Sequence, residues 1–196
     1  MPGKLIGPIT GFTDRMKGKG MSSSAFLTQI GNSSAQSTGG GNIYSGLTPV
    51  SNGADTTADT LFSATLPANL FDVAGRCVTI QLFGSVSATS ATKTVGFAFG
   101  GSISQSIVQY TTTNTGSWQA FVQIFKTGSN AQIALFQADA SGTTASVLGI
   151  ASGRALTVVT GTETDTAGIV VKVTGQSSVA TAGLVTCSAF IVDAYN

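Results

Sequence analysis

Apolar and polar residues alternate along much of the chain after residue 60, and this alternation predicts β-strands. In residues 78–83, 94–99 and 118–125, aliphatic or aromatic side chains occupy every second position. A period of two with many β-branched and aromatic residues is typical of strands, because successive side chains point to opposite faces of a sheet. Further runs of this kind cover residues 131–138, 145–150, 155–160, 169–174 and 184–194.

Short polar clusters between these runs predict tight turns. Gly-Gly-Ser at residues 100–102 and Thr-Gly-Ser-Asn at residues 127–130 are two of them, and no window of eleven residues has the spacing of an amphipathic helix. Strands that recur roughly every 10 to 15 residues with short connections are typical of a β-sandwich or a barrel. The pattern therefore predicts an all-β domain.

The first 43 residues have a different composition and predict an extended N-terminal arm. Gly, Ser, Asn and Thr dominate this segment, which leads into three consecutive glycines at residues 39–41. Its few apolar residues are scattered in small groups, too few for a core of its own. We therefore expect two parts, an attachment arm over residues 1–43 and a β domain over residues 44–196.

The arm also carries an excess of positive charge. Four basic residues and a single acid, Asp14, fall within the first twenty residues, whereas acids slightly outnumber bases from residue 21 onward. One interpretation is a solvated basic tail, and the other is an arm that docks on an acidic surface. On the second interpretation, the partner-binding side chains are the basic and apolar ones: Lys4, Leu5, Ile6, Phe12, Arg15, Lys17, Lys19, Phe26 and Leu27.

Composition indicates a folded domain whose surface carries little charge. Hydrophobic residues make up 42% of the 196 residues and charged residues only 9%, against about 25% charged residues in typical proteins. Disordered chains are poor in aromatic and β-branched residues, and this chain contains 11 Phe beside many Val, Ile and Thr. The domain should therefore fold and present hydroxyl groups to solvent.

One predicted strand carries apolar side chains on both of its faces. It covers residues 119–125, Gln-Ala-Phe-Val-Gln-Ile-Phe, whereas a strand with one face in water should be polar on that face. Either a loop covers the outer face, or this face packs against a neighbouring copy. Few surface charges and open strand edges favour closed oligomerisation, and we expect a homotrimer.

The residue types that usually carry catalysis are scarce in this chain. It has no histidine, which excludes His-based nucleophile systems and removes the commonest metal ligand. The glycines at residues 100–101 are followed by neither a Lys-Ser/Thr pair nor a predicted helix, so they form no phosphate-binding loop. We therefore expect no enzymatic activity, no catalytic residue, no cofactor and no metal site.

Glu163 and Asp165 are the strongest candidates for a functional pair of acids. They fall in a Thr-rich segment that predicts a hairpin tip, so a structural turn is favoured over calcium binding, and calcium binding over catalysis. Asp55 and Asp59 are interpreted in the same way, as solvated turn residues. Packing in the core or at an interface, rather than stacking on sugars, is expected of the aromatic residues Trp118, Tyr44, Tyr110 and Tyr195.

Cysteine usage, charge and hydropathy indicate the compartment. Cys77 and Cys187 each fall in a strand-like run, so buried free thiols are favoured over a disulfide. No run approaches the roughly 18 apolar residues that span a bilayer, and the apolar stretch at residues 5–12 is too short and too interrupted for a signal peptide. The net charge of +1 gives no reason to expect nucleic acid. We expect assembly in a reducing cytoplasm, without a membrane or nucleic-acid partner.

Three segments resemble jelly-roll structural proteins of tailed-bacteriophage virions. Residues 59–71 (DTLFSATLPANLF), followed by a long strand, are similar to the opening of such modules, and residues 93–101 (KTVGFAFGG) to the lysine-led strand and glycine turn after it. Residues 171–176 (VKVTGQ), before a final strand that ends at Tyr195, resemble the closing part. The resemblance covers roughly residues 59–196. It implies a jelly-roll-like antiparallel β-sandwich in a virion component that is commonly trimeric.

Three functional hypotheses follow from these features. In the first, a capsid decoration (cement) protein clamps the major capsid protein or other virion proteins with its arm and stabilises the head shell. In the second, a tail-fibre or receptor-binding module recognises host surface saccharide through exposed loops. The third, a carbohydrate-degrading enzyme, is weakest because long repeats and convergent carboxylates are missing. We favour decoration, because an arm rich in small residues suits threading over repeated shell subunits.

Overall fold

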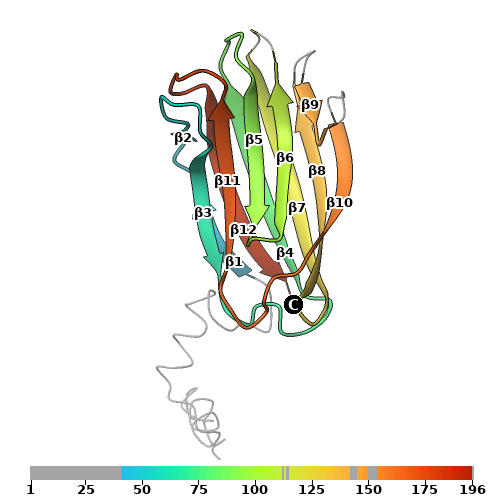
Figure 1. Ribbon diagram of the computed structural model, residues 1–196. Helices are drawn as coiled ribbons and strands as arrows, with labels where there is room; N and C mark the ends of the chain where they lie inside the picture. The colour runs from blue at the N-terminus through green and yellow to red at the C-terminus, as the bar shows by residue number, and fades with distance from the viewer. Residues whose placement is uncertain (1–40, 112, 114, 142–144, 150–153, 196) are drawn as a thin grey trace, which may run out of the picture. The chain divides into compact units, whose positions relative to one another are not determined.

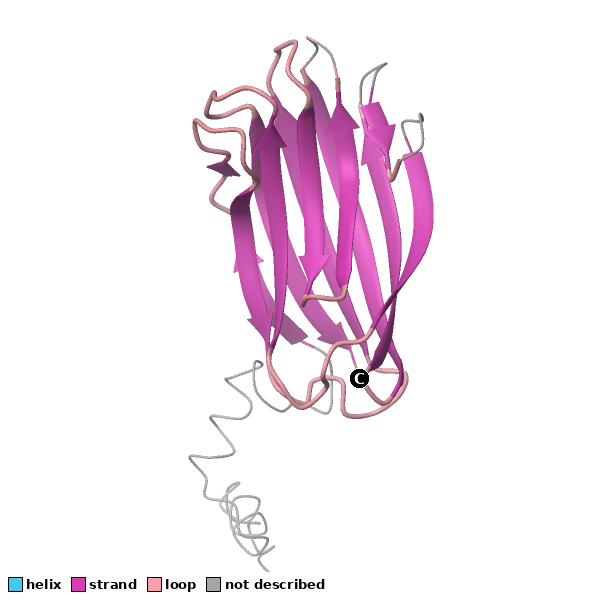
Figure 2. Cartoon of the chain, in the orientation of Figure 1, coloured by secondary structure: helices cyan, strands magenta, loops and turns pink. Residues whose placement is uncertain are grey.

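The described part of the chain consists of strands and turns. The computed structural model describes residues 41–111, 113, 115–141, 145–149 and 154–195, and these residues contain no helix (Figures 1 and 2). The predicted arm lies outside the described residues, except that strand β1 already begins at Gly41, inside the predicted boundary at residue 43. The strands of the described residues are β1 (Gly41–Gly46), β2 (Val50–Ser51), β3 (Asp59–Leu66), β4 (Cys77–Val86), β5 (Lys93–Phe99), β6 (Ile103–Tyr110), β7 (Gly116–Gly128), β8 (Ala131–Ala140), β9 (Ala145–Val147), β10 (Arg154–Gly161), β11 (Ile169–Ser177) and β12 (Val185–Tyr195).

These strands form two antiparallel sheets that pack face to face. The large sheet has the order β1-β12-β4-β7-β8-β10, with β2 paired to β12, and the small sheet has the order β3-β11-β5-β6-β9. Figure 1 shows the two layers with β3, β11, β5 and β6 of the small sheet toward the viewer. The predicted all-β sandwich is therefore confirmed.

The strand order is that of a jelly roll, in which pairs of strands are nested inside one another. The innermost pair is β5–β6, the next is β4–β7, then β3–β11, and the outermost is β1–β12. Successive pairs alternate between the small and the large sheet. The strands β8, β9 and β10 follow β7 and extend both sheets at the same end. The jelly-roll-like prediction is thus confirmed, with three additional strands.

The core lies between the two sheets and is formed by the inward-facing member of each alternating pair. Phe97 of the small sheet meets Phe136 of the large sheet edge to face, with ring centroids 5.4 Å apart. At another position Phe62 of β3 stacks on Phe190 of β12 at 5.9 Å. Aromatic pairs of this geometry add about 0.5–1.5 kcal/mol beyond the area that they bury. These pairs fasten the two layers together across the sandwich.

Most predicted strands are present, and the differences have local causes. Strand β6 escaped prediction because a register shift opposite Val95 and Gly96 places two neighbouring residues, Ile107 and Val108, in the core and breaks the period of two. The predicted strand at residues 145–150 ends at Val147, since Leu148 has a φ of +50° and turns the chain. A positive φ is unusual for a residue other than glycine, asparagine or aspartate.

Gly84 is required where the large sheet accommodates the indole of Trp118. Gly84 of β4 pairs with Trp118 of β7, and Trp118 is buried in the core. A Cβ atom at Gly84 would lie 2.1 Å from the carbonyl oxygen of Thr186 and 2.3 Å from Cζ2 of Trp118. No ordinary contact is that short, and the carbonyl belongs to the backbone of the neighbouring strand. The indole therefore occupies the space that any larger residue would need.

We predict that Gly84→Ala lowers the free energy of unfolding by about 3 kcal/mol, because overpacking a core costs about 1–3 kcal/mol or more. The matched control is Gly101→Ala in the turn after β5, where a new Cβ would meet nothing within 4 Å. Urea unfolding followed by circular dichroism measures both. The control should stay within about 0.5 kcal/mol of wild type, and equal losses in the two variants would contradict this account of the Trp118 site.

Candidate functional site

The predicted partner-binding residues of the arm lie outside the described residues. All nine of them fall between Lys4 and Leu27. The attachment role of the arm therefore stays a prediction. The described residues offer three other places to look for function, which are the outer faces of the two sheets, the polar groups in the turns, and the two cysteines.

The outer face of the large sheet carries aromatic rings between amide side chains. Strand pairing places Phe83 of β4 opposite Gln119 of β7, and Phe121 of β7 between Gln81 of β4 and Gln137 of β8. Apolar side chains continue across the sheet to the edge strand β10. Together they form what we call the apolar band: Phe83, Phe121, Phe125, Leu135, Leu156 and Val158.

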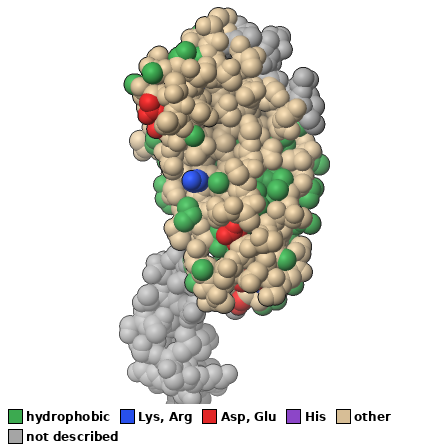
Figure 3. Space-filling model, in the orientation of Figure 1, with side chains coloured by type: hydrophobic (Ala, Val, Ile, Leu, Met, Phe, Trp, Pro, Cys, Tyr) green, Lys and Arg blue, Asp and Glu red, His purple; other side chains and the backbone are tan. Residues whose placement is uncertain are grey.

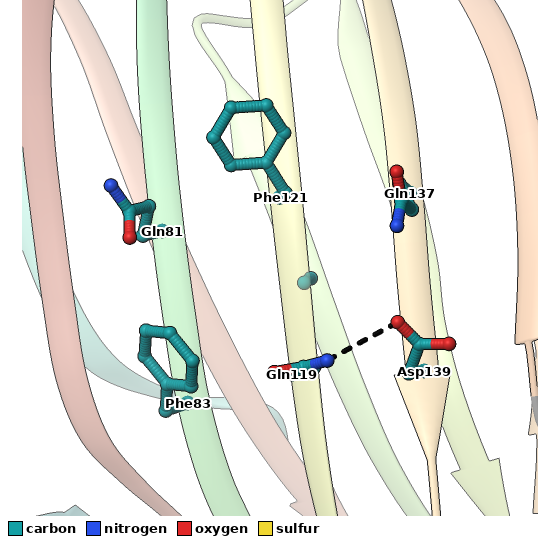
Figure 4. Close-up of a pocket in the computed structure, with 7 residues that line it drawn as sticks. Gln81, Phe83, Gln119, Phe121, Gln137 and Asp139 are labelled. Atoms are coloured by element: carbon teal, nitrogen blue, oxygen red, sulfur yellow. Dashed lines mark hydrogen bonds between the residues drawn. The ribbon is translucent and has the colours of Figure 1, made fainter.

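A shallow hollow of about 200 Å³ opens within this face. Figure 4 shows Phe121 and Phe83 on either side of it, with Gln81, Gln119, Gln137 and Asp139 around them. Nε2 of Gln119 donates a hydrogen bond to a carboxylate oxygen of Asp139, 3.2 Å away.

The other carboxylate oxygen of Asp139 lies 3.4 Å from Nε of Arg154. Because both of its oxygens have partners, Asp139 holds the edge of the hollow in place. The hollow therefore combines ring faces with neutral hydrogen-bonding groups.

The outer face of the small sheet has a different chemistry. Its central strands β11 and β5 turn Lys172, Thr174, Thr94 and Ala98 outward, with Lys172 opposite Ala98 in the pairing register. Figure 3 views the molecule from this side, and most of its described surface is backbone and side chains that are neither hydrophobic nor charged. Hydroxyl-bearing and small side chains need no partner beyond water. The sandwich thus has small and hydroxyl-bearing side chains on one outer face and aromatic rings between amides on the other.

Asp165 belongs to a buried polar network at one end of the sandwich, which we call the clasp. Its carboxylate is paired with the ammonium of Lys126 from the end of β7. It also accepts hydrogen bonds from the backbone N–H of Asn130 at 2.8 Å and from Nε2 of Gln132 at 2.9 Å. The loop between β10 and β11 is thereby tied to the β7–β8 turn. The structural-turn interpretation of Asp165 agrees with this geometry.

Glu163 ties the loop between β10 and β11 to the small sheet. One of its carboxylate oxygens accepts hydrogen bonds from the backbone N–H groups of Gly101 at 2.8 Å and Ser102 at 2.6 Å. Its own backbone N–H donates to Oε1 of Gln132 at 2.8 Å. Glu163 therefore fastens the β5–β6 turn to the same loop, and both acids bind protein groups. The predicted hairpin tip is wrong, because β10 and β11 lie in different sheets and this loop crosses between them.

The charge of Asp165 is maintained by its neighbours. Burial alone would raise the pKa of its carboxyl group, but the hydrogen bonds from Lys126, Asn130 and Gln132 and the positive charge of Lys126 together hold that pKa below its usual value. A carboxylate that accepts several hydrogen bonds is stabilised in its charged form. The clasp therefore depends on an ionised Asp165.

A second buried cation, Lys93, closes the opposite connection of the jelly roll. Its side chain is fully buried, and Nζ donates hydrogen bonds to the carbonyl oxygens of Ser87 at 3.1 Å and Thr89 at 2.9 Å. Burial lowers the pKa of this ammonium group. Lys93, at the start of β5, is thus a structural residue that holds the β4–β5 loop.

Two further acids and two aromatic residues of the described part have structural roles too, whereas Tyr195 is outside the core, with 51% of its surface exposed. Asp55 accepts hydrogen bonds from the backbone N–H and the hydroxyl of Thr57, which is a local turn motif. Asp59 accepts the backbone N–H of Gly53 at 2.7 Å. Trp118 and Tyr110 are core residues, as expected, with 2% and 1% of their surface exposed.

The two cysteines are free thiols, as predicted. Cys77 is opposite Tyr195, whereas Cys187 is opposite Gly84, so the two lie seven residues apart along β4. That separation is about 23 Å at the usual rise of a strand, far beyond the roughly 7 Å that a disulfide allows between Cα atoms. Cys187 is buried, as expected, whereas Cys77 is only half-buried.

Other kinds of site have little support in the described residues. They contain no cluster of three or more Cys, Asp and Glu side chains arranged to hold a metal ion. Nor do they include a helix that could cross a bilayer. No protein-family model matches the sequence, and no curated protein matches it either.

We predict that Asp165→Asn lowers the free energy of unfolding by about 3 kcal/mol near neutral pH, because it leaves the buried ammonium of Lys126 without a counter-charge. Since the pKa of Asp165 is depressed in the folded protein, its contribution is complete above the unfolded value of about 3.9. That contribution is lost as the pH falls through the lower folded value. The difference in the free energy of unfolding between variant and wild type should therefore become smaller below about pH 4.

The control for this comparison is Asp72→Asn. Asp72 is paired with Arg76 on the surface, where 48% of its side chain is exposed. Exposed pairs contribute about 0–1 kcal/mol. Urea unfolding over a range of pH compares the three proteins. If the free energy of unfolding of Asp165→Asn differs from that of wild type by the same amount at every pH, the charge of Asp165 is not what stabilises the loop.

We predict that the thiols react slowly in the native protein, and Cys187 most slowly. Burial raises the pKa of Cys187 to about 12 and also raises that of Cys77, and only the thiolate is a nucleophile. Labelling with an aromatic disulfide reagent should modify Cys77 first and Cys187 only on unfolding. In urea without reductant, both thiols should react at once. A thiol titration that finds no free cysteine in the unfolded protein would contradict the assignment.

Proposed function

We propose that this chain is a virion structural protein, a capsid decoration (cement) protein of a tailed bacteriophage. In this proposal the β-sandwich is the displayed body and the N-terminal arm binds the major capsid protein or another virion protein. The protein acts as a homotrimer in the virion, which is assembled in the host cytoplasm. It uses no cofactor and carries out no reaction.

The observation that carries the proposal is the use of the polar groups in the described residues. Glu163, Asp165 and Lys93 hold loops at the ends of the sandwich through hydrogen bonds to protein groups. An outer face that is apolar remains available for contact with other protein. A body of this kind offers surfaces for assembly, which is what a structural component of a shell requires.

The segments that resemble phage proteins support the same proposal, because they are neighbours in space. Residues 59–71 begin with β3, residues 93–101 contain β5, and residues 171–176 lie within β11. These three strands are adjacent in the small sheet, in the order β3-β11-β5. The resemblance therefore covers one continuous structural unit, although it does not extend to the arm.

The arm is suited to attachment on physical grounds. Ordering a chain costs about 1–2 kcal/mol of backbone entropy per residue, so an arm of this length needs an extensive partner surface or several copies acting together. Its short apolar groups supply contact area, and its excess of basic residues complements a shell that is acidic outside. A trimer presents three arms and gains from multivalency.

The amide-lined hollow favours one alternative, a receptor-binding module that recognises host surface saccharide. Gln81, Gln119 and Gln137 can each donate and accept hydrogen bonds, and the rings of Phe83 and Phe121 lie beside them. Copy number separates the two functions. Decoration requires hundreds of copies in each particle and a fibre requires few, so a quantitative gel of purified particles distinguishes them.

We predict that deleting residues 2–40 yields a folded sandwich that no longer binds particles. The deletion stops before Gly41, where β1 begins to pair with β12, so the fold and the oligomeric state should be retained. Co-sedimentation with phage heads measures binding, and circular dichroism checks folding. If the truncated protein still decorates heads at full occupancy, attachment belongs to the sandwich.

Reversing Lys17 and Lys19 to Glu should weaken attachment, and more at low salt, where exposed charges are less screened. Lys172→Glu is the control, because this lysine lies on the outer face of the small sheet. If the arm variant and the control variant lose head binding equally, the loss is a general effect of added negative charge.

A further inference from the structure

The outer face of the large sheet is wide enough for a protein contact. Five strands from β12 to β10 give a width of about 24 Å, and seven residues along each strand give about 23 Å. Its flat projection is therefore about 550 Å², and the relief of the side chains adds to that area. A standard protein interface takes about 800 Å² from each partner. With the relief of its side chains, the whole face approaches the area that one specific contact requires.

The distribution of charge indicates which partner this face fits. The two central strands, β4 and β7, turn no charged side chain outward, since the one charge in β7, Lys126, belongs to the buried clasp. The charges that the described strands carry on this face have partners: Asp139, which lines the hollow beside β7, is paired with Arg154, and Asp193 at the far side accepts a hydrogen bond from Asn42. Residues that lie close to a symmetry axis meet the identical residues of the neighbouring copies. Charges near that axis would therefore repel one another.

The glutamine side chains between the rings are also compatible with contact between identical copies. Gln81, Gln119, Gln123 and Gln137 alternate with the rings across β4, β7 and β8. A glutamine side chain both donates and accepts hydrogen bonds, so it can pair with the same residue of another copy. A carboxylate or an ammonium group could not do so. Rings and amides in alternation are therefore complementary to themselves.

We propose that this face is where copies of the chain associate, with the apolar band at the contact and β7 nearest the symmetry axis. The band runs from Phe83 on one side of β7 to Val158 on the edge strand β10. The hollow between Phe83 and Phe121 accepts a side chain of the neighbouring copy. The inference rests on the homotrimer of the proposed function but requires neither the arm nor a capsid.

Two substitutions of similar exposure test the face. Phe83, on the apolar band, is 40% exposed, and Val170, on the outer face of the small sheet, is 43% exposed. Light scattering coupled to gel filtration is carried out on full-length wild type, on the double variant Phe83→Glu/Phe121→Glu, and on Val170→Glu. A hot-spot residue changes a dissociation constant by about 30-fold or more. We expect an oligomer for wild type and for Val170→Glu, and a monomer for the double variant at the same micromolar concentration.

Circular dichroism checks that the double variant is folded. If it is not, Phe83→Gln/Phe121→Gln replaces it, since amides already occupy the neighbouring positions of this face. Weaker association of that uncharged variant supports the proposal. An oligomer that neither double variant weakens overturns it, and so does a monomeric wild type. In a monomeric protein, loss of head binding on the same substitutions would assign the face to the capsid protein, whereas loss of binding to host lipopolysaccharide would assign it to saccharide.

The test is separate from that of the proposed function. Association is measured without particles, and the arm is intact in every variant. A protein that forms the oligomer but fails to bind heads would disprove decoration and leave this face assigned. A monomer that binds heads through its arm would support decoration and overturn the assignment of this face.

Discussion

The pairing of the two C-terminal strands with the N-terminal half of the domain is the constraint on which the rest of the structure depends. Strand β11 lies between β3 and β5 in the small sheet, and β12 lies between β1 and β4 in the large sheet. Each is therefore an interior strand that supplies hydrogen bonds on both sides. Without them β1 and β3 would have no partner in their sheets, and Phe62 would lose Phe190 across the core. Such long-range pairing gives a high contact order, which is typical of slowly folding β-sandwiches.

Buried polar groups then determine how the ends of this sandwich close. The side chain of Asn52 donates hydrogen bonds to the carbonyl oxygens of Gly53 and Thr181 and accepts the backbone N–H groups of Leu184 and Val185. It thus holds the loop that precedes β12. The clasp around Asp165 does the same at the loop before β11. Because an unsatisfied buried polar group costs about 1–3 kcal/mol, these networks favour one arrangement of the loops over others. They hold both C-terminal strands in register.

Alternation of side chains was enough to predict the strands and the sandwich, and it failed where the backbone departs from regular pairing. The strand from Trp118 to Phe125 was recognised because each second residue enters the core. Strand β6 was missed because a register shift makes Ile107 and Val108 both buried. The first strand was missed because Gly41–Gly46 has few apolar residues and owes its place to pairing with β12. Local pattern cannot reveal a strand whose stability comes from a partner 150 residues away.

The candidate sites show the same limit. A turn at Glu163 and Asp165 could be predicted from composition, but their partners could not. Lys126 and Gln132 belong to a different hairpin, and nothing in the spacing of these residues indicates that they meet. Phe121 was different, because the pattern of residues 119–125 already placed apolar side chains on both sides of one strand. The sequence therefore predicted a strand with apolar residues on both faces, while the register of the sheet was needed to show which residues share its outer face.

The low charge of the chain acquires a physical meaning from the two outer faces. Water covers the hydroxyl-rich small sheet without help from ionised groups, as the side chains around Thr94 and Thr174 illustrate. On the large sheet, charges would oppose close approach of another surface, and the two central strands have none facing outward. A protein that is monomeric in solution would gain solubility from charged residues on that face, at little cost to the stability of its fold. Their absence from β4 and β7, together with glutamines that both donate and accept hydrogen bonds, fits the proposed contact between copies of the chain. Because the rest of the chain carries few charges, the basic residues of the first twenty positions are the strongest electrostatic feature of the sequence.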